Sequence, residues 1–374
     1  MQKTPEPKLK MNTPNQLTRG STIGILGDGQ LGKMLALAAQ QLGYKVVVWG
    51  TDTMAPAMQV ATIKIVAPYD NEVAFYQMKE AADIITSEWE NIPFELLKQF
   101  EQAGKLVRPG GEVFAIAQNR WMEKSLCKKL DIPTTPTMQV RNIGNHPVDD
   151  LTIFSDFLPG RLKTNYDGYD GKGQHAISKP EEIIPMLENR GEYDFVLERN
   201  VTFEYEASIQ VARNPVSGVR LSDAVVNSHE GGILKMSHAG TDTISETALL
   251  RMKEYAQKIA IDTDLFGTIV VEFFVLEDET VLVNEIAPRP HNSFHASIEA
   301  AYTSQFLQHI LAICNLPLGN VLFHHVCEMQ NLLGGEVNEV SHESTNNQTV
   351  HIYGKEGEDP GRKMGHVTTL ISPR

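Results

Sequence analysis

The chain has 374 residues, with 33 lysines and arginines against 47 aspartates and glutamates and a formal net charge of −14. This acidity argues against a nucleic-acid partner, which needs a basic surface, and against binding to an anionic membrane. No apolar run approaches the roughly 18 residues that a membrane-spanning helix requires. Three widely spaced cysteines without a CxxC pair fit a reducing cytoplasm better than a disulfide framework. The polar residues 1–20 resemble no secretory signal, and we expect a disordered arm there.

The next segment, residues 21–115, alternates short β-branched runs with helical patterns. The expected elements are strands at 22–27, 44–49, 83–86 and 105–107 and helices at 31–42 and 95–103. Strands and helices that alternate at this spacing are typical of a parallel sheet with crossover helices. We therefore predict a Rossmann-like N-terminal domain.

The rest of the chain has a more mixed pattern. The expected elements are helices at 112–130, 247–261 and 304–313 and strands at 195–197, 205–211, 268–276 and 280–286, before a polar, glycine-rich end. The sequence DIPTTP at 131–136 interrupts the first of these helices. The predicted fold class is therefore α/β followed by α+β.

Two glycine-rich stretches could bind phosphate. Residues 27–32 (GDGQLG) fit G-x-G-x-x-G between a strand and a helix, whose first amides can face an anionic group. The nearest acid, Asp52, lies two residues beyond the second strand and is poorly placed for a dinucleotide ribose, so another phosphate ligand or a structural turn stays open. Residues 163–174 contain three glycines around Lys172 and could wrap phosphate oxygens or form a surface turn.

Two strands separated by Glu277–Glu279 predict an antiparallel hairpin. A turn centred between Asp278 and Glu279 places Glu272 opposite Glu285. Like charges opposite each other destabilise a sheet unless something neutralises them, and two carboxylates suit Mg²⁺. The pair is a candidate metal site; a solvent-facing pair on an edge hairpin is the alternative. We expect Glu277–Glu279 to be a solvated turn.

An irregular polar segment, APRPHNSFH at 287–295, follows the second carboxylate. Arg289 offers a planar donor fork that suits a phosphate. His291 and His295 have an i, i+4 spacing, but the prolines beside Arg289 argue against a helical zinc pair. Near the end of the chain, Lys355, Arg362 and Lys363 form a local basic cluster that would suit a phosphomonoester or a solvated turn.

Together these residues resemble the ATP-grasp superfamily, and within it the 5-(carboxyamino)imidazole ribonucleotide synthetases. The motifs that carry the resemblance are GDGQLGKM (27–34), TSEWENI (86–92), DGYDGKGQ (167–174), VEFFV (271–275), NEIAPRPHNS (284–293), NLLG (331–334) and YGK with GRKMGH (353–366). The resemblance implies an ATP-grasp fold with an N-terminal domain at 21–115, an ATP-grasp domain at 116–310 with a mobile lid at about 135–200, and a C-terminal domain at 311–374.

The resemblance also implies an activity. ATP would phosphorylate bicarbonate to carboxyphosphate, and the amine of 5-aminoimidazole ribonucleotide would capture the carboxyl group, in purine biosynthesis. Mg²⁺ or Mn²⁺ would bind at Glu272 and Glu285. The implied ATP-binding residues are Arg120, Lys163, Gly168, Tyr169, Asp170, Gly171, Lys172, Gly173, Gln174, Glu198, Arg199, Asn200, Val201, Glu206, His229, Asn284 and Glu285.

Substrate contacts follow from the same motifs. The implied substrate-binding residues are Gln30, Leu31, Glu88, Tyr169, Arg289, His291, Asn292, Lys355 and Arg362, and the implied catalytic residues are Arg289, Lys172, Asp170 and His291. The family usually has glycine where this chain has Asp28, Asp167 and Phe294. A homodimer is implied, with the apolar helix at 304–313 as one candidate contact.

Other functions remain open at this level. A formate-dependent phosphoribosylglycinamide formyltransferase, also an ATP-grasp enzyme, shares the glycine loop and a similar proline-arginine-proline-histidine segment. An NAD-dependent oxidoreductase would use residues 27–32 for the cofactor. A non-catalytic nucleotide-binding relative is a third alternative, against which the carboxylate pair and Lys163 argue.

Overall fold

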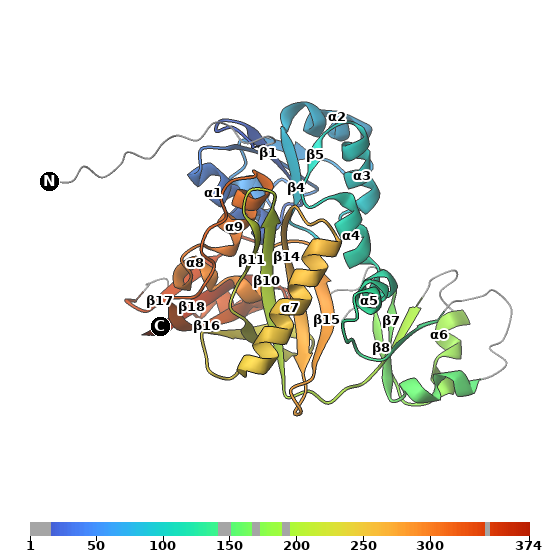
Figure 1. Cartoon of the computed structure of the whole chain (residues 1–374). Helices are drawn as coiled ribbons and strands as arrows, with labels where there is room; N and C mark the ends of the chain where they lie inside the picture. The colour runs from blue at the N-terminus through green and yellow to red at the C-terminus, as the bar shows by residue number, and fades with distance from the viewer. Residues whose placement is uncertain (1–15, 141–150, 167–172, 189–194, 341–344) are drawn as a thin grey trace.

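The computed structural model describes residues 16–140, 151–166, 173–188, 195–340 and 345–374. Most of the predicted arm and the centre of the second glycine-rich stretch, including Asp167, lie outside these ranges. The described chain forms three sheets, which Figure 1 shows as an upper N-terminal unit, a larger lower unit and a small unit to one side. None of the helices in these ranges is long and apolar enough to cross a membrane.

The N-terminal sheet has five strands in the order β3-β2-β1-β4-β5, and every pair in it is parallel, as predicted. Its elements are β1 (Thr22–Leu26), α1 (Gln30–Gln41), β2 (Lys45–Gly50), the short η1 (Pro56–Gln59), β3 (Ile63–Val66), α2 (Glu72–Ala81), β4 (Ile84–Ser87), α3 (Phe94–Gln102) and β5 (Leu106–Val107). The sequence pattern missed β3 and α2. Both lie at the surface: β3 is an edge strand, and α2 buries only Ala74 and Met78.

The prediction of a single helix at 112–130 is wrong. The structure has two, α4 (Gly111–Gln118) and α5 (Arg120–Lys129). Asn119 separates them in an extended conformation, with φ −117° and ψ 106°, and its side chain accepts a hydrogen bond from the Met122 amide at 2.8 Å. This N-cap starts α5 at Arg120 and so places that side chain in the first turn of the helix.

The small unit is a four-stranded antiparallel sheet in the order β6-β9-β7-β8. It comprises β6 (Thr137–Val140), η2 (Leu151–Phe157), β7 (Gly160–Thr164), β8 (Gln174–Ile177), η3 (Pro180–Glu182), α6 (Ile184–Glu188) and β9 (Phe195–Arg199). It has its own core, in which Phe154, Leu162 and Phe195 are buried. The unit covers the residues of the predicted lid, whose movement stays a prediction.

The large sheet runs in the order β15-β14-β10-β12-β13-β16-β18-β17, with β11 paired to β10. Its strands are β10 (Tyr205–Asn214), β11 (Gly218–Leu221), β12 (Val225–Glu230), β13 (Ile233–Ala239), β14 (Gly267–Val275), β15 (Val281–Ala287), β16 (His325–Leu333), β17 (Gln348–Ile352) and β18 (Lys363–Pro373). Helix α7 (Glu246–Asp262) packs across β10, β14 and β15 (Figure 1). The polar end of the chain thus contains strands that the sequence pattern missed, and these strands extend the same sheet.

Helix α9 (Gln305–Ile313) joins the two large units. It follows η4 (Asn292–Phe294) and α8 (Ser297–Ala300), and it contacts α1, β10 and β14. Phe306, Ile310 and Ile313 share a core cluster with residues of α1 and the N-terminal sheet. Most of the apolar face of this helix is therefore buried inside the chain, whereas Leu307 and Leu311 are half-buried; its part in a dimer contact stays a prediction.

Candidate active site

The hairpin of β14 and β15 carries the two predicted metal ligands. Its strands are antiparallel and Glu272 pairs with Glu285, as predicted. The turn, however, is centred on Asp278, and a register shift beyond Glu272 leaves Asn284 as the extra residue that brings the two glutamates opposite each other. The facing pair therefore results from a β-bulge, a device common beside active sites. The solvated turn at Glu277–Glu279 is confirmed, since all three residues are exposed.

Neither carboxylate simply faces solvent. Their side chains are 16% and 36% exposed, the His291 Nε2 atom lies 3.3 Å from Glu272 Oε1, and the Arg120 Nη1 atom lies 3.9 Å from Glu285 Oε2. Burial, reinforced by the charge of Glu285, raises the pKa of Glu272 to about 8, although His229 opposes the shift. Two carboxylates that repel each other in a partly dry site are a donor set that a divalent cation relieves. The pair thus fits Mg²⁺.

His291 has a defined protonation state. The Ser293 amide donates to Nδ1 at 3.3 Å, and burial together with Arg289 holds the His291 pKa well below its usual value. The ring is therefore neutral, and this hydrogen-bond pattern places its proton on Nε2, which faces Glu272. His295 instead packs against Phe306, so the two histidines do not form a zinc pair. Across the described ranges, no three or more His, Cys, Asp or Glu side chains are arranged to hold a metal.

A buried ion network lies beside the carboxylate hairpin. Lys163 of β7 pairs with Glu198 of β9, and both residues were predicted to bind ATP. Lys124 lies 3.0 Å from Glu123 Oε1 and 3.9 Å from Glu198 Oε1, and it donates to the backbone carbonyl of Asn284. Burial alone would raise the pKa of Glu198, but the charges of Lys163 and Lys124 outweigh it and lower that pKa to about 2.

Lys124 and Glu123 are site residues that sequence reasoning missed. Both are buried in α5, and Glu123 Oε2 accepts a hydrogen bond from the Ile286 amide at 2.7 Å. In the sequence they follow Arg120 within a helical pattern, where charges normally mark a solvated face. Their partners on β9 and β15 lie 70 or more residues away, so no local signal distinguishes them.

Two residues of the large sheet that were predicted to bind the nucleotide also contact each other. Glu206 of β10 forms an ion pair with His229 of β12, and this hydrogen bond raises the pKa of His229 against the opposing effect of burial. Strand β9 ends at Arg199 and the chain continues through Asn200 to Val201; Arg199 and Asn200 are exposed, and the Asn200 amide donates to the Pro159 carbonyl at 2.9 Å. This hydrogen bond holds Asn200 to the small unit, and the chain beyond it leads to β10 of the large sheet, where a hinge is expected.

The first glycine loop is occupied by a side chain of the protein. The amides of Gly29 and Gly32 donate to the Glu88 carboxylate at 2.8 and 3.1 Å. A Cβ at Gly29 would lie 2.9 Å from Glu88 Oε1, so glycine is required for this close approach. For Gly29 and Gly32 the idea that the loop amides face an anionic ligand is thus wrong, because the carboxyl group of Glu88, directly after β4, accepts from both. This arrangement leaves the pyrophosphate of a dinucleotide no place at the helix start.

The substrate motif at 289–292 has polar groups without partners. Arg289 pairs with Glu90, but its Nε atom is buried without a hydrogen bond among the described residues. The Asn292 side chain is likewise buried, and neither its oxygen nor its nitrogen has a partner there. Buried polar groups are rarely left unpaired unless a ligand or water completes them. These atoms mark a place that fits a polar ligand.

Other predicted contacts have distinct surroundings. Gln30 begins α1 and is half-buried, whereas the Leu31 side chain packs into the core, which leaves only its backbone for a ligand. Lys355 lies with its ammonium 5.6 Å from the centre of the Tyr353 ring. Arg362 donates to the Glu356 carbonyl.

The second glycine-rich stretch is described only at its end. Gly168, Tyr169, Asp170, Gly171 and Lys172 lie outside the described residues. Gly173 and Gln174 follow them, and Gln174 pairs with Lys163 across β7 and β8. The stretch therefore ends beside a lysine of the buried ion network.

Two departures from the family pattern point into the protein. The Asp28 carboxylate accepts hydrogen bonds from the amides of Thr51 and Asp52 at 2.8 and 3.1 Å. The Phe294 side chain is 1% exposed and packs near Phe323. Both side chains thus have partners within the protein.

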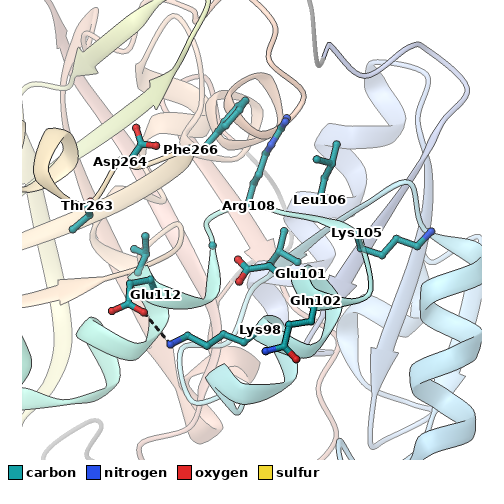
Figure 2. Close-up of a pocket in the computed structure, with 13 residues that line it drawn as sticks. Lys98, Glu101, Gln102, Lys105, Leu106, Arg108, Glu112, Thr263, Asp264 and Phe266 are labelled. Atoms are coloured by element: carbon teal, nitrogen blue, oxygen red, sulfur yellow. Dashed lines mark ion pairs between the residues drawn. The ribbon is translucent and has the colours of Figure 1, made fainter.

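Two hollows differ in chemistry. A small one of about 20 Å³ adjoins the ion network and is lined in part by Glu90, Arg120 and Glu285. A groove of about 660 Å³ lies where α3, β5 and α4 meet the segment after α7 (Figure 2). Three of its charged side chains are in ion pairs: Figure 2 shows Lys98 joined to Glu112, at 2.9 Å, and Asp264 pairs with Arg213 at 2.8 Å. The groove lies apart from the carboxylate hairpin.

The three sheets and the buried lysine–carboxylate site define an ATP-grasp protein. The model of the ATP-grasp domain matches residues 125–306, that of the ribonucleotide synthetase preATP-grasp domain residues 20–118, and that of the phosphoribosylaminoimidazole carboxylase C-terminal domain residues 327–372. The chain is thus an enzyme of the ATP-dependent ligase class.

Comparison with individual proteins gives the family. The N5-carboxyaminoimidazole ribonucleotide synthase of Brucella melitensis is 38% identical over 365 residues, which cover 96% of this chain and 98% of the relative. A crystal structure of the Staphylococcus aureus synthetase with ADP has a TM-score of 0.85 at 36% identity, covering 96% and 95% of the two chains. The Aspergillus clavatus synthase with ADP and 5-aminoimidazole ribonucleotide has a TM-score of 0.85 at 27% identity, covering 95% of each. The chain belongs to the N5-carboxyaminoimidazole ribonucleotide synthase family.

Proposed function

We propose that this enzyme carboxylates 5-aminoimidazole ribonucleotide with ATP and bicarbonate, giving 5-carboxyaminoimidazole ribonucleotide, ADP and phosphate in purine biosynthesis. It acts in the cytoplasm, as a homodimer, with Mg²⁺ or Mn²⁺. The observation that carries the proposal is the pairing of Glu272 with Glu285 beside Arg120 and His291. Relatives over nearly the full chain support the same reaction.

ATP binds between the small unit and the large sheet. Arg120 and Lys163 hold the phosphates, the segment Glu198–Val201 contacts adenine, and Glu206 with His229 contacts the ribose. Glu272 and Glu285 hold the divalent cation, which neutralises charge on the transferred phosphoryl group. A bicarbonate oxygen forms a bond to the γ-phosphorus as the bond to ADP breaks, so that carboxyphosphate results. Carboxyphosphate is labile in water, and we assign residues 168–174 to its protection from hydrolysis.

The ribonucleotide then captures the carboxyl group. Its exocyclic amine forms a bond to the carboxyl carbon and loses a proton, while the carbon–oxygen bond to phosphate breaks. Arg289 supplies fixed positive charge, and the Nε2 proton of neutral His291 is a donor for anionic oxygens. Tyr169, Asp170, Lys172 and Asn292 complete this part of the site. Lys355 and Arg362 bind the substrate phosphate at its far end.

A comparison of substrates tests the proposal. ADP formation is measured with 5-aminoimidazole ribonucleotide plus bicarbonate, and in parallel with glycinamide ribonucleotide plus formate. We expect stimulation by the first pair; stimulation by the second pair alone would identify a formyltransferase instead. Titration with NADH is the control for a dinucleotide enzyme, and we expect no binding because Glu88 takes the loop amides.

A further inference from the structure

Side chains of the N-terminal unit form hydrogen bonds with the short segment Tyr353–Gly354, just before Lys355. The Lys33 ammonium of α1 donates to the Tyr353 carbonyl at 2.9 Å and to Gln59 Oε1 at 3.1 Å. Gln59, at the end of η1, in turn donates from Nε2 to the Gly354 carbonyl at 2.8 Å. Two of these hydrogen bonds connect residues about 300 positions apart, and the third joins Lys33 to Gln59. We name Lys33 and Gln59 the clamp.

The backbone conformation and the small size of Gly354 allow these hydrogen bonds. Its φ of +79° lies in the left-handed region that glycine adopts without strain. A Cβ at this position would lie 2.8 Å from Gln59 Oε1 and 3.0 Å from Gln59 Nε2. Any larger residue would push Gln59 away from the segment. The backbone and the clamp therefore fit only with glycine between them.

Tyr353 is held from the other side by the histidine-rich interior. It is 3% exposed, and its hydroxyl lies 2.8 Å from His366 Nδ1. The fully buried His366 ring stacks on His295, with centroids 4.7 Å apart, and on His351, at 4.5 Å. His295 ends the segment that carries Arg289 and Asn292. One stack of rings thus links Tyr353 to the ligand-binding segment.

The Tyr353 ring is also the surface on which Lys355 rests, since the Lys355 ammonium lies 5.6 Å from the ring centre, within cation–π range. We propose that Lys33 and Gln59 are positioning residues for recognition of the substrate phosphate. By fixing Tyr353 and Gly354 they hold Lys355 where it binds the phosphate of the ribonucleotide. This rests on the proposed function, and it assigns to the N-terminal unit a part in phosphate recognition.

The test compares 5-aminoimidazole ribonucleotide with the ribonucleoside that lacks the phosphate. Lys33→Met and Gln59→Leu remove the donors at similar volume, and we expect each to lower kcat/KM for the ribonucleotide about tenfold, chiefly through KM. We expect little change with the ribonucleoside, and a KM for ATP within twofold of wild type. Lys33→Arg, which retains a donor, should recover most of the loss.

Two controls separate positioning from general stability. Gln40→Leu removes another hydrogen bond between α1 and the end of η1, from Gln40 Nε2 to the Val60 carbonyl at 2.8 Å, without touching Tyr353 or Gly354. We expect it to leave the ratio of the two substrates unchanged. Combined with Lys355→Met, the clamp variants should cost little more than Lys355→Met alone, because both act on one contact.

Equal losses on both substrates, or losses that add to that of Lys355→Met, would overturn the positioning role. Wild-type protein without ribonucleotide-dependent ADP formation would refute the proposed function itself, and the positioning role with it. Melting temperatures measured alongside show that the variants fold. Should either clamp variant fail to fold, Gly354→Ala, which displaces Gln59, gives the same comparison.

Discussion

The buried His309, which links α9 to the N-terminal sheet, predicts how the unfolding free energy changes with pH. It lies on α9, is 0% exposed, and its Nε2 atom is 2.8 Å from Thr86 Oγ1 on β4. Its other ring nitrogen is buried without a hydrogen bond among the described residues. Burial lowers the pKa of His309 from 6.5 to about 3, because nothing nearby compensates a charged ring.

The sign of the effect follows from linkage. The unfolded chain takes up a proton near pH 6.5, whereas the folded chain resists it until about pH 3. The stability that a neutral His309 contributes is therefore present above pH 6.5 and is lost progressively as the pH falls toward 3. Between pH 7 and pH 5 this single group should cost about 2 kcal/mol of unfolding free energy.

Urea unfolding of wild type and of His309→Phe at both pH values isolates this contribution. The variant loses its bond to Thr86 at every pH, but it cannot titrate, so its loss between pH 7 and pH 5 should be smaller by about 2 kcal/mol. Gln308→Leu is the matched control. Gln308 lies on the same helix as His309, and its side chain accepts a hydrogen bond from the Gly319 amide at 2.9 Å. The substitution removes this hydrogen bond but no titratable group. Equal pH losses in wild type and His309→Phe would refute the reasoning.

Three further outcomes follow. Glu285→Gln should abolish ATP turnover while circular dichroism stays unchanged; retained turnover contradicts the metal role. Lys124→Met leaves the buried Glu123 without its cation and Glu198 with Lys163 alone, and should lower the unfolding free energy by about 3–5 kcal/mol; Lys124→Arg should recover part of that loss. Gly29→Ala, whose Cβ would lie 2.9 Å from Glu88 Oε1, should cost about 1–3 kcal/mol in urea unfolding; an unchanged midpoint would contradict the role of Glu88.

Local patterns predicted much of this protein correctly. The alternation of apolar runs with helices predicted the parallel N-terminal sheet, because a strand and its crossover helix are neighbours in sequence. The helices α7 and α9 begin directly after Ser245 and Ser304, whose side chains cap them, and both agree closely with the predicted ranges. The facing of Glu272 and Glu285 was also predicted, although from a turn centre between Asp278 and Glu279; the observed turn is centred on Asp278, and the bulge at Asn284 compensates for the difference. Surface elements with little apolar periodicity, such as β3 and α2, were missed.

The partners of the charged side chains were decided only by the tertiary structure. The sequence determined which residues lie on which strand or helix, because those preferences act over a few neighbours. It could not show that Glu88 fills the glycine loop, that the buried Lys124 lies between Glu123 and Glu198, or that the bulge at Asn284 sets the pairing of the two glutamates. Each of these contacts joins groups from different elements, and its energy depends on burial that exists only once the chain has folded.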